Sequence, residues 1–422
     1  MSPSAKTAPF FHVAIVGGGI AGLSLAIALH HHDISVNLYE QASAFSEVGA
    51  GVSFGPNTVE AMKLCDIGIY NAFKKVCTKN LWPAKDNVGF DYLDGYTHNE
   101  DEQNFAFTIT NSLEQTGVHR AHFIDELVKL IPGEIAQLNK RLEGIEERPD
   151  DGKLVLKFAD GAQEEADVVI GCDGIKSRVR QILVGEDHPS AHPSYTHKYA
   201  HRGLVPMNKA IKAIGEELAS NSCMHAQKMG PSNHMPTFPV NAGQTLNIVA
   251  FHTTPDPWNE YPRLTRDGTR EEALRDFAGY GPNLSIWAIF DLTNPVPTFS
   301  KSRLAISGDA AHATSPYHGT GAGFCLEDTA ILARIREDHG DLEAVLAVFD
   351  ASRRERTQWL VQSSRFISDC YEWRADEVGR DFAKIEEEIS WRNGIIMDVD
   401  GFGVGKGTCH SPNPEEHWLE PD

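Results

Sequence analysis

Three glycines near the N-terminus have a spacing that suits the binding of a dinucleotide. Gly17, Gly19 and Gly22 form the pattern G-x-G-x-x-G. The first glycine of such a pattern permits a tight turn, the second lets the backbone approach a pyrophosphate, and the third lets a helix pack closely on a strand. Glu40 follows at the end of the next apolar run. A carboxylate there suits the two ribose hydroxyls of an adenosine and would repel a 2′-phosphate, so the four residues predict an adenine dinucleotide site.

Two later motifs combine acidic residues with glycines. The first is D-G-x-x-S-x-x-R, formed by Asp173, Gly174, Ser177 and Arg180. The second is Gly-Asp-Ala-Ala-His at 308–312, which a glycine-rich run at 319–323 follows. Each has a purely structural alternative. The first would be a turn at a strand end with Ser177 capping a helix, and the second a glycine-rich turn before a structural helix.

The three motifs, in this order, resemble the fingerprint of the class A flavoprotein monooxygenases. These aromatic hydroxylases carry FAD on a single Rossmann-type domain. The resemblance implies that Arg120 lies against the flavin, with a plain surface arginine as the alternative. It also implies that Asp173 and Gly174 approach both FAD and the nicotinamide cofactor. The chain has only one G-x-G-x-x-G pattern, which fits a family that binds NAD(P)H transiently as a co-substrate.

The late motif is expected to meet the flavin ring and its side chain. In the resembled family, the aspartate at Asp309 hydrogen-bonds the ribityl chain. Gly319, Gly321 and Gly323 are expected to let the chain pass close to the isoalloxazine edge without Cβ clashes. Gly321 and Ala322 are therefore predicted flavin contacts. The helix that follows, expected over 323–336, would direct its positive N-terminus at the flavin pyrimidine ring.

Hydroxylation of a phenol also requires residues that favour the ionised substrate, because a phenolate reacts far better than a phenol. Arg202 is the first candidate, pairing with a phenolate or carboxylate; its alternative is a salt bridge within the sheet. His234 is the second, as a base or hydrogen-bond donor, with a satisfied loop histidine as its alternative. Pro316, Tyr317 and His318 form the third, since this loop meets the flavin in the family, and simple packing is their alternative.

The resemblance implies hydroxylation of a small phenolic or salicylate-like aromatic by O₂ and NAD(P)H, through a flavin C4a-hydroperoxide. Residues 230–251 look like salicylate hydroxylases, and residues 195–205 resemble fungal phenol hydroxylases. For salicylate, the reaction would release CO₂ and leave catechol. The alternative substrate is a substituted phenol or a phenolic aldehyde of fungal secondary metabolism. Phe238 stands where many relatives carry tyrosine, which leaves the substrate class open. The choice between NADH and NADPH is also open.

Two alternatives come from other classes of protein. One is a non-catalytic flavin-binding protein. The other is a serine hydrolase, because residues 51–55 match G-x-S-x-G, the nucleophile elbow of the α/β-hydrolases. An elbow needs a strand before it and a helix immediately after, whereas residues 50–57 are interpreted as a glycine-rich loop.

The elements that must position these residues are predicted from apolar runs and turn residues. Short β-branched runs predict buried parallel strands at 12–16, 35–39, 168–171 and 304–306, with an apolar helix at 20–29. Residues 142–169 predict a meander with turns at Asp-Gly pairs. A strand is expected at 199–205, a hairpin at 235–251, and a core-facing helix within 350–373.

The fold class is therefore α/β, with a Rossmann-type FAD-binding domain interleaved with an antiparallel-sheet substrate domain and a C-terminal helical segment. The FAD-binding domain is predicted to comprise residues 1–75, 106–186 and 300–340. The substrate domain is predicted at 76–105 and 187–299, the helical segment at 341–400, and a loosely ordered tail at 401–422.

Composition limits the partners. The 422 residues carry a formal net charge of −21, which disfavours nucleic acid and anionic membranes. No apolar run is long enough for a membrane span, and the N-terminal residues lack the pattern of a signal peptide. The seven cysteines contain no C-x-x-C pattern, so no metal site is predicted and reduced thiols in the cytoplasm are expected. A monomer and a homodimer both remain open.

Overall fold

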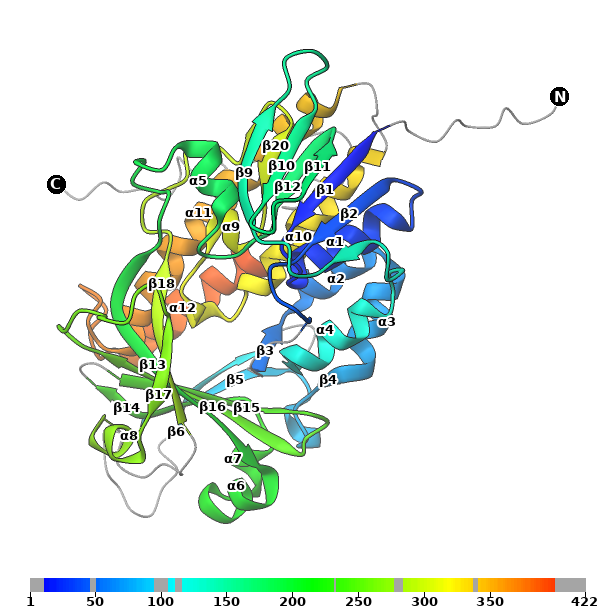
Figure 1. Cartoon of the computed structure of the whole chain (residues 1–422). Helices are drawn as coiled ribbons and strands as arrows, with labels where there is room; N and C mark the ends of the chain where they lie inside the picture. The colour runs from blue at the N-terminus through cyan, green and yellow to red at the C-terminus, as the bar shows by residue number, and fades with distance from the viewer. Residues whose placement is uncertain are drawn as a thin grey trace.

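A mostly parallel sheet forms one half of the protein (Figure 1). The computed structural model describes residues 11–45, 51–94, 105–110, 116–230, 233–276, 284–336 and 341–398. Within these ranges the sheet has the order β19-β20-β12-β1-β2-β8, and only β19 runs antiparallel to its neighbour. Its strands are β1 (His12–Val16), β2 (Ser35–Tyr39), β8 (Ala136–Gln137), β12 (Val168–Gly171), β19 (Ser300–Lys301) and β20 (Leu304–Ile306).

The helices that pack on this sheet are apolar where they meet it. The first, α1 (Ile20–His30), is buried from Ile20 to Leu29, as expected of a helix that is apolar on all sides. The predicted helix at 323–336 instead begins two residues earlier, as α10 (Gly321–Leu332), and ends in a 3₁₀ turn, η3 (Ala333–Arg336). The other helices of this half are α2 (Pro56–Cys65), α3 (Ile67–Val76), α4 (Arg120–Val128), α5 (Arg178–Val184) and α9 (Asp309–His312).

Two smaller sheets of three strands each are also present. The predicted meander is present as β9 (Leu142–Glu147), β10 (Leu154–Phe158) and β11 (Gln163–Ala166), with positive φ angles at Gly152 and Gly161 in its turns. The other sheet has the order β3-β7-β4, formed by β3 (Gly51–Phe54), β7 (Thr116–His119) and β4 (Cys77–Thr78).

The prediction of a glycine-rich loop over the G-x-S-x-G pattern was wrong. Residues 51–54 pair with β7 as strand β3, and α2 begins at Pro56. Cross-strand pairing and proline at the first helical turn outweigh the glycines here. Ser53 lies inside the strand rather than at the strand-to-helix turn, which Gly55 occupies, so it does not have the position of a hydrolase nucleophile.

A larger sheet forms the other half of the molecule (Figure 1). Its order is β17-β18-β13-β16-β15-β14-β5-β6. It is antiparallel except where β14 pairs in parallel with β5, a crossover that the prediction of an antiparallel sheet did not include. The strands are β5 (Val88–Asp94), β6 (Phe105–Thr110), β13 (Ser194–Pro206), β14 (Cys223–Gly230), β15 (Asn233–Val240), β16 (Thr245–Thr253), β17 (Thr265–Gly268) and β18 (Leu284–Asp291).

The predicted domain boundary at residue 105 would separate β6 from its partner β5, so any boundary there belongs after β6. The predicted hairpin is present as β15 and β16, with positive φ angles at Asn241, Ala242 and Gly243 in its turn. The connecting segments contain short helices: η1 (Pro83–Lys85), α6 (Met207–Ile214), α7 (Glu216–Ala219), α8 (Arg270–Asp276) and η2 (Pro316–His318).

The predicted core-facing helix is part of α11 (Leu342–Tyr371), which α12 (Phe382–Met397) follows. Ile367, Cys370 and Tyr371 of α11 pack in a cluster with Phe251 of the large sheet.

Among the residues described, all six cysteines are free thiols. In the same residues no helix is long and apolar enough to cross a membrane, and no three His, Cys, Asp or Glu side chains are grouped for a metal. The predicted tail at 401–422 lies outside those residues.

Gly323 of the late motif has a packing role. A Cβ on Gly323 would lie 2.2 Å from Thr58 Oγ1 of α2, whereas a Cβ on Gly321 would make ordinary contact with Thr314. Gly323 therefore lets α10 approach α2 closely.

We predict that Gly323→Ala lowers the free energy of unfolding by about 1–3 kcal/mol, because the added methyl overpacks this contact. Denaturant unfolding of the variant measures the loss. Thr58→Ala in the same chain removes the hydroxyl and should restore most of it. Gly394→Ala in α12 is the control, since no atom lies within 4 Å of its Cβ position and the change should be neutral or slightly stabilising. A double variant no more stable than Gly323→Ala alone would contradict this interpretation.

Candidate active site

A cavity of ≈ 930 Å³ lies between the carboxyl ends of β1, β2 and β12 and one face of the large sheet. Parallel sheets commonly bind ligands at this edge. The cavity brings together fourteen of the fifteen predicted site residues, from segments spread over about three hundred positions. Those that line it are Gly17, Gly19, Glu40, Arg120, Asp173, Gly174, Arg202, His234, Asp309, Pro316, Tyr317, His318, Gly321 and Ala322.

Two glycines of the first motif are required by close packing, and the third leaves open space beside the backbone. Gly17 has φ +108°, and a Cβ there would lie 2.3 Å from the Cys172 carbonyl oxygen. A Cβ on Gly22, which does not line the cavity, would lie 1.9 Å from the Gly17 carbonyl oxygen. A Cβ on Gly19 would meet nothing within 4 Å. The backbone at Gly19 and the N-terminus of α1, which begins at Ile20, therefore form an open cradle of the kind that a pyrophosphate needs.

The Glu40 carboxylate lies where the dinucleotide motif predicts it. It accepts hydrogen bonds from the backbone N–H groups of Gly18 and Ala42, each at 2.7 Å. These bonds fix a charged acceptor at the cavity wall, next to the glycine loop. The arrangement fits an adenosine ribose.

The mid-chain motif forms a turn at a strand end with a helix cap, as its structural alternative predicts, and it also lines the cavity. Ser177 caps α5, and the Asp173 carboxylate accepts hydrogen bonds from Ser177 Oγ and from the N–H groups of Arg178 and Val179. The Arg180 guanidinium is fully buried and donates to the carbonyl of Ala310 at 2.8 Å. Burial lowers the pKa of Arg180 to about 10, so it stays charged at neutral pH. The motif thereby ties its own turn to the Gly-Asp-Ala-Ala-His segment.

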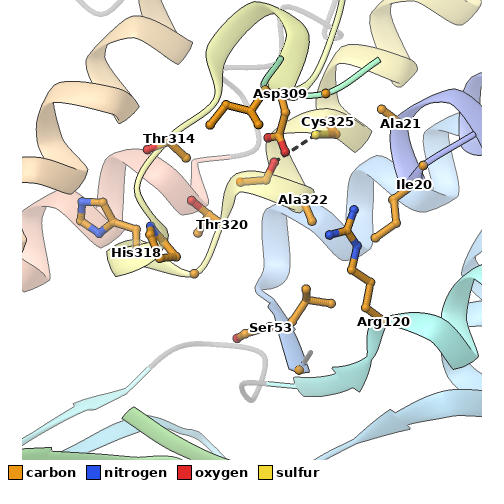
Figure 2. Close-up of a pocket in the computed structure, with 18 of the residues that line it drawn as sticks. Ile20, Ala21, Ser53, Arg120, Asp309, Thr314, His318, Thr320, Ala322 and Cys325 are labelled. Carbon is orange, nitrogen blue, oxygen red and sulfur yellow. Dashed lines mark hydrogen bonds between the residues drawn. The ribbon is translucent and has the colours of Figure 1, made fainter. Parts of the chain in front are cut away.

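Figure 2 shows the part of the cavity formed by the late motif. Asp309 begins α9, and Ala322 lies in the first turn of α10. Arg120, the first residue of α4, extends toward the start of α10 (Figure 2). A carboxylate, a helix N-terminus and a guanidinium therefore border one space, and this set fits the ribityl chain and ring of a flavin.

The register of the large sheet places the predicted substrate residues on one face. Arg202 of β13 is opposite Val249 of β16, two positions from Phe251, and Phe251 is opposite His234 of β15. Residues at alternate positions share a face, so all four point to the cavity that they line. Phe238 is on the same face and packs where Cβ atoms of Gly51 and Gly117 would lie.

Arg202 is not in the salt bridge that was its structural alternative. Among the described residues no carboxylate lies within ion-pair distance of its guanidinium, which stacks on the Trp287 ring at 4.7 Å. Burial, and the nearby charge of Arg120, lower the pKa of Arg202 to about 10. Two arginines thus place positive charge in the cavity of an otherwise acidic protein.

The loop with Pro316, Tyr317 and His318 connects the part of the cavity formed by the late motif to the part formed by the large sheet. The Tyr317 ring lies 4.9 Å from Phe251 and 5.2 Å from His234. Burial raises the pKa of Tyr317 well above its usual value, so the phenol stays neutral. His318 Nε2 lies 2.9 Å from Ser363 Oγ, and burial, with Arg392, lowers the pKa of His318 to about 3. His318 is therefore a neutral hydrogen-bonding group at physiological pH.

Two buried side chains beside the cavity were missed by the sequence analysis. Glu372 follows α11 and lies 3.3 Å from His234, and Lys198 of β13 contacts Glu372. A strand extended back to Ser194 would have put Lys198 on the face of Arg202, four positions away. No local pattern marks Glu372, because only the packing of α11 on the sheet brings it there.

Comparisons with known proteins agree on the family. The profile of a family described as "FAD binding domain" matches residues 11–364. The chain is 44% identical to "FAD-dependent monooxygenase pigN" of Monascus ruber, over 94% of this chain and 95% of that protein. It is 42% identical to "6-methylsalicylate 1-monooxygenase atA" of Aspergillus terreus, over 84% of this chain and 81% of that protein.

A solved structure has the same fold. The structure described as "Salicylate hydroxylase substrate complex" matches with a TM-score of 0.80 and 32% identity, over 94% of this chain and 98% of that one. Together with the cradle for a dinucleotide and the flavin-side residues, these matches identify the chain as a member of the FAD-dependent monooxygenases.

Proposed function

We propose that this monooxygenase hydroxylates a phenolic or salicylate-like aromatic whose negative charge is bound by Arg202. The observation that carries the proposal is a half-buried guanidinium facing the cavity without a carboxylate partner among the described residues. A charge that is partly removed from water and has no partner favours an anionic ligand. The planar guanidinium suits a carboxylate or phenolate.

The residues of the cavity divide into those for the cofactor and those for the substrate. We assign Gly17, Gly19, Glu40, Arg120 and Asp309 to FAD. Bound FAD, reduced by NAD(P)H, supplies the activated oxygen from O₂ for attack on an electron-rich ring. Asp173, Gly174, Gly321 and Ala322 complete the wall on that side.

The large sheet forms the substrate side. Arg202 holds the anionic group of the substrate and thereby favours the phenolate over the phenol. Phe238 and Phe251 offer apolar surface to the aromatic ring. His234 is the one histidine of this face that borders the cavity in the described part of the sheet, and we assign it the phenolic proton. The names of two matched proteins, a 6-methylsalicylate monooxygenase and a salicylate hydroxylase, support this substrate class.

We predict that salicylate stimulates aerobic NADH or NADPH oxidation by the purified yellow protein and is converted to catechol with release of CO₂. Oxygen uptake and product analysis measure this, with benzoate, which lacks the phenol, as the control. Stimulation by a substituted phenol or phenolic aldehyde alone would keep the phenolic proposal and exclude the decarboxylating reaction. No stimulation by any phenol, with FAD bound, would contradict the proposed substrate class.

We further predict that Arg202→Ala raises the KM for the aromatic substrate at least tenfold, or diverts NAD(P)H oxidation to H₂O₂, because a charge-assisted contact contributes about 1.5–3 kcal/mol. The ratio of product to NAD(P)H consumed measures the coupling. Arg263→Ala, at an exposed position, is the matched control. Unchanged KM and coupling in Arg202→Ala, with full FAD content, would refute the assignment.

A further inference from the structure

A buried ionic group lies beside the cavity, at the end of the sheet face that carries Arg202. Its members are His234 of β15, Lys198 of β13 and Glu372, the residue after α11. The side chains of His234 and Glu372 are 1% and 0% exposed, and that of Lys198 is 8% exposed. Burying ionisable groups costs free energy, so their retention next to a reaction site points to a use in the reaction.

Glu372 contacts each of the others with a different oxygen. Its Oε2 accepts hydrogen bonds from Lys198 Nζ and from Thr253 Oγ1, both at 2.8 Å. Its Oε1 lies 3.3 Å from His234 Nδ1, at ion-pair distance but without hydrogen-bond geometry, and neither atom has a hydrogen-bond partner among the described residues. The contacts of Oε2 thus hold the carboxylate in place and leave Oε1 for the imidazole.

The His234 imidazole is held between aromatic rings. The imidazole stacks on Phe251 at 4.7 Å, and Tyr317 and Tyr371 flank it at 5.2 and 5.3 Å. Within the described part of the chain, both ring nitrogens are buried without a hydrogen-bond partner, although His234 borders the cavity. Nδ1 has the Glu372 carboxylate at 3.3 Å, which leaves Nε2 for a ligand. A buried ring nitrogen without a partner is costly unless a ligand completes it.

We propose that Glu372 is a positioning residue: it holds the His234 proton on Nδ1, so that Nε2 accepts the phenolic proton of the substrate. The inference rests on the proposed function. The proton moves from the substrate oxygen to Nε2, and the phenolate and imidazolium that result face Arg202 and Glu372, respectively. The carboxylate acts through the histidine, as the orienting acid does in a catalytic triad.

The charges around His234 agree with this arrangement. Burial lowers the pKa of His234, which keeps the imidazole neutral and able to accept a proton. Glu372 and Asp369 oppose that lowering, and Lys198 adds to it. Burial alone would raise the pKa of Glu372, but His234 and Lys198 lower it, so the carboxylate is ionised at neutral pH. Removing the carboxylate should therefore make His234 a weaker base.

The test is the ionisation of a bound phenol. Salicylaldehyde is a suitable probe, because its phenolate absorbs at longer wavelength than its phenol. Bound to the FAD-loaded protein, it should ionise at lower pH than in solution. In Glu372→Gln the midpoint should rise by about one pH unit, a tenfold change, and kcat near neutral pH should fall about 10–100-fold, as for other residues that orient a histidine. His234→Gln should shift the midpoint similarly, and adding Glu372→Gln to it should shift it no further.

The controls separate positioning from folding. Glu355→Gln makes the same substitution at an exposed site of α11 and should leave the midpoint unchanged. Lys198→Met with Glu372→Gln removes the buried lysine together with the carboxylate. Because Lys198 lowers the pKa of His234, this double variant should show a shift in the same direction as Glu372→Gln but a smaller one. A wild-type midpoint in Glu372→Gln, with FAD retained, would overturn the inference and leave the proposed function standing. If wild-type protein neither ionises salicylaldehyde nor oxidises NAD(P)H with any phenol, the proposed function itself fails.

Discussion

The Asp328 carboxylate, buried in α10, is the contact on which the geometry of the site depends. One oxygen accepts the N–H of Gly308 at 2.9 Å and lies 2.7 Å from His312 Nε2, and the other accepts from Arg353 Nε of α11 at 2.7 Å. Although burial opposes its ionisation, His312 and Arg353 hold the pKa of Asp328 well below its usual range. A single charged group thus fixes the turn before Asp309 to two long helices.

This network explains how widely spaced motifs share one cavity. Arg353 also contacts Glu327 at 2.7 Å, so its buried charge is balanced by two neighbouring acids. From the other side, Arg180 donates to Ala310, one residue after Asp309. The segment that begins α9 is therefore held by the mid-chain motif and by α10 together. Networks of buried ion pairs of this kind are rigid, and a rigid wall is what a flavin site requires.

The two sides of the cavity are built by different means. On the FAD side, backbone groups and glycines provide the surface, because the pyrophosphate needs N–H donors and close approach. On the substrate side, alternate side chains of antiparallel strands provide it, because the pleat presents every second residue to one face. Arg120 brings positive charge to the FAD side of the cavity and Arg202 brings it to the substrate side, in a chain with a formal net charge of −21. The local field, not the total charge, decides which substrate is attracted.

The sequence by itself determined the elements and motifs that depend on neighbouring residues. Local spacing and turn chemistry predict the strands β1, β2 and β12, the turn at the glycine motif and the cap at Ser177. The prediction of a dinucleotide site rests on the same local features. The family could also be recognised, because its motifs are short and lie at element ends. Arg202 and His234 were proposed as candidates from the chemistry that hydroxylation of a phenol requires.

Only the tertiary structure decided which side chains meet. Residues 51–54 form a strand because β7 pairs with them, and Gly323 is required by Thr58, which is remote in sequence. The parallel pairing of β5 with β14 joins segments more than a hundred residues apart. Glu372 reaches His234 only because α11 packs against the sheet. Such contacts arise from long-range packing, which leaves no periodic or local pattern in the chain.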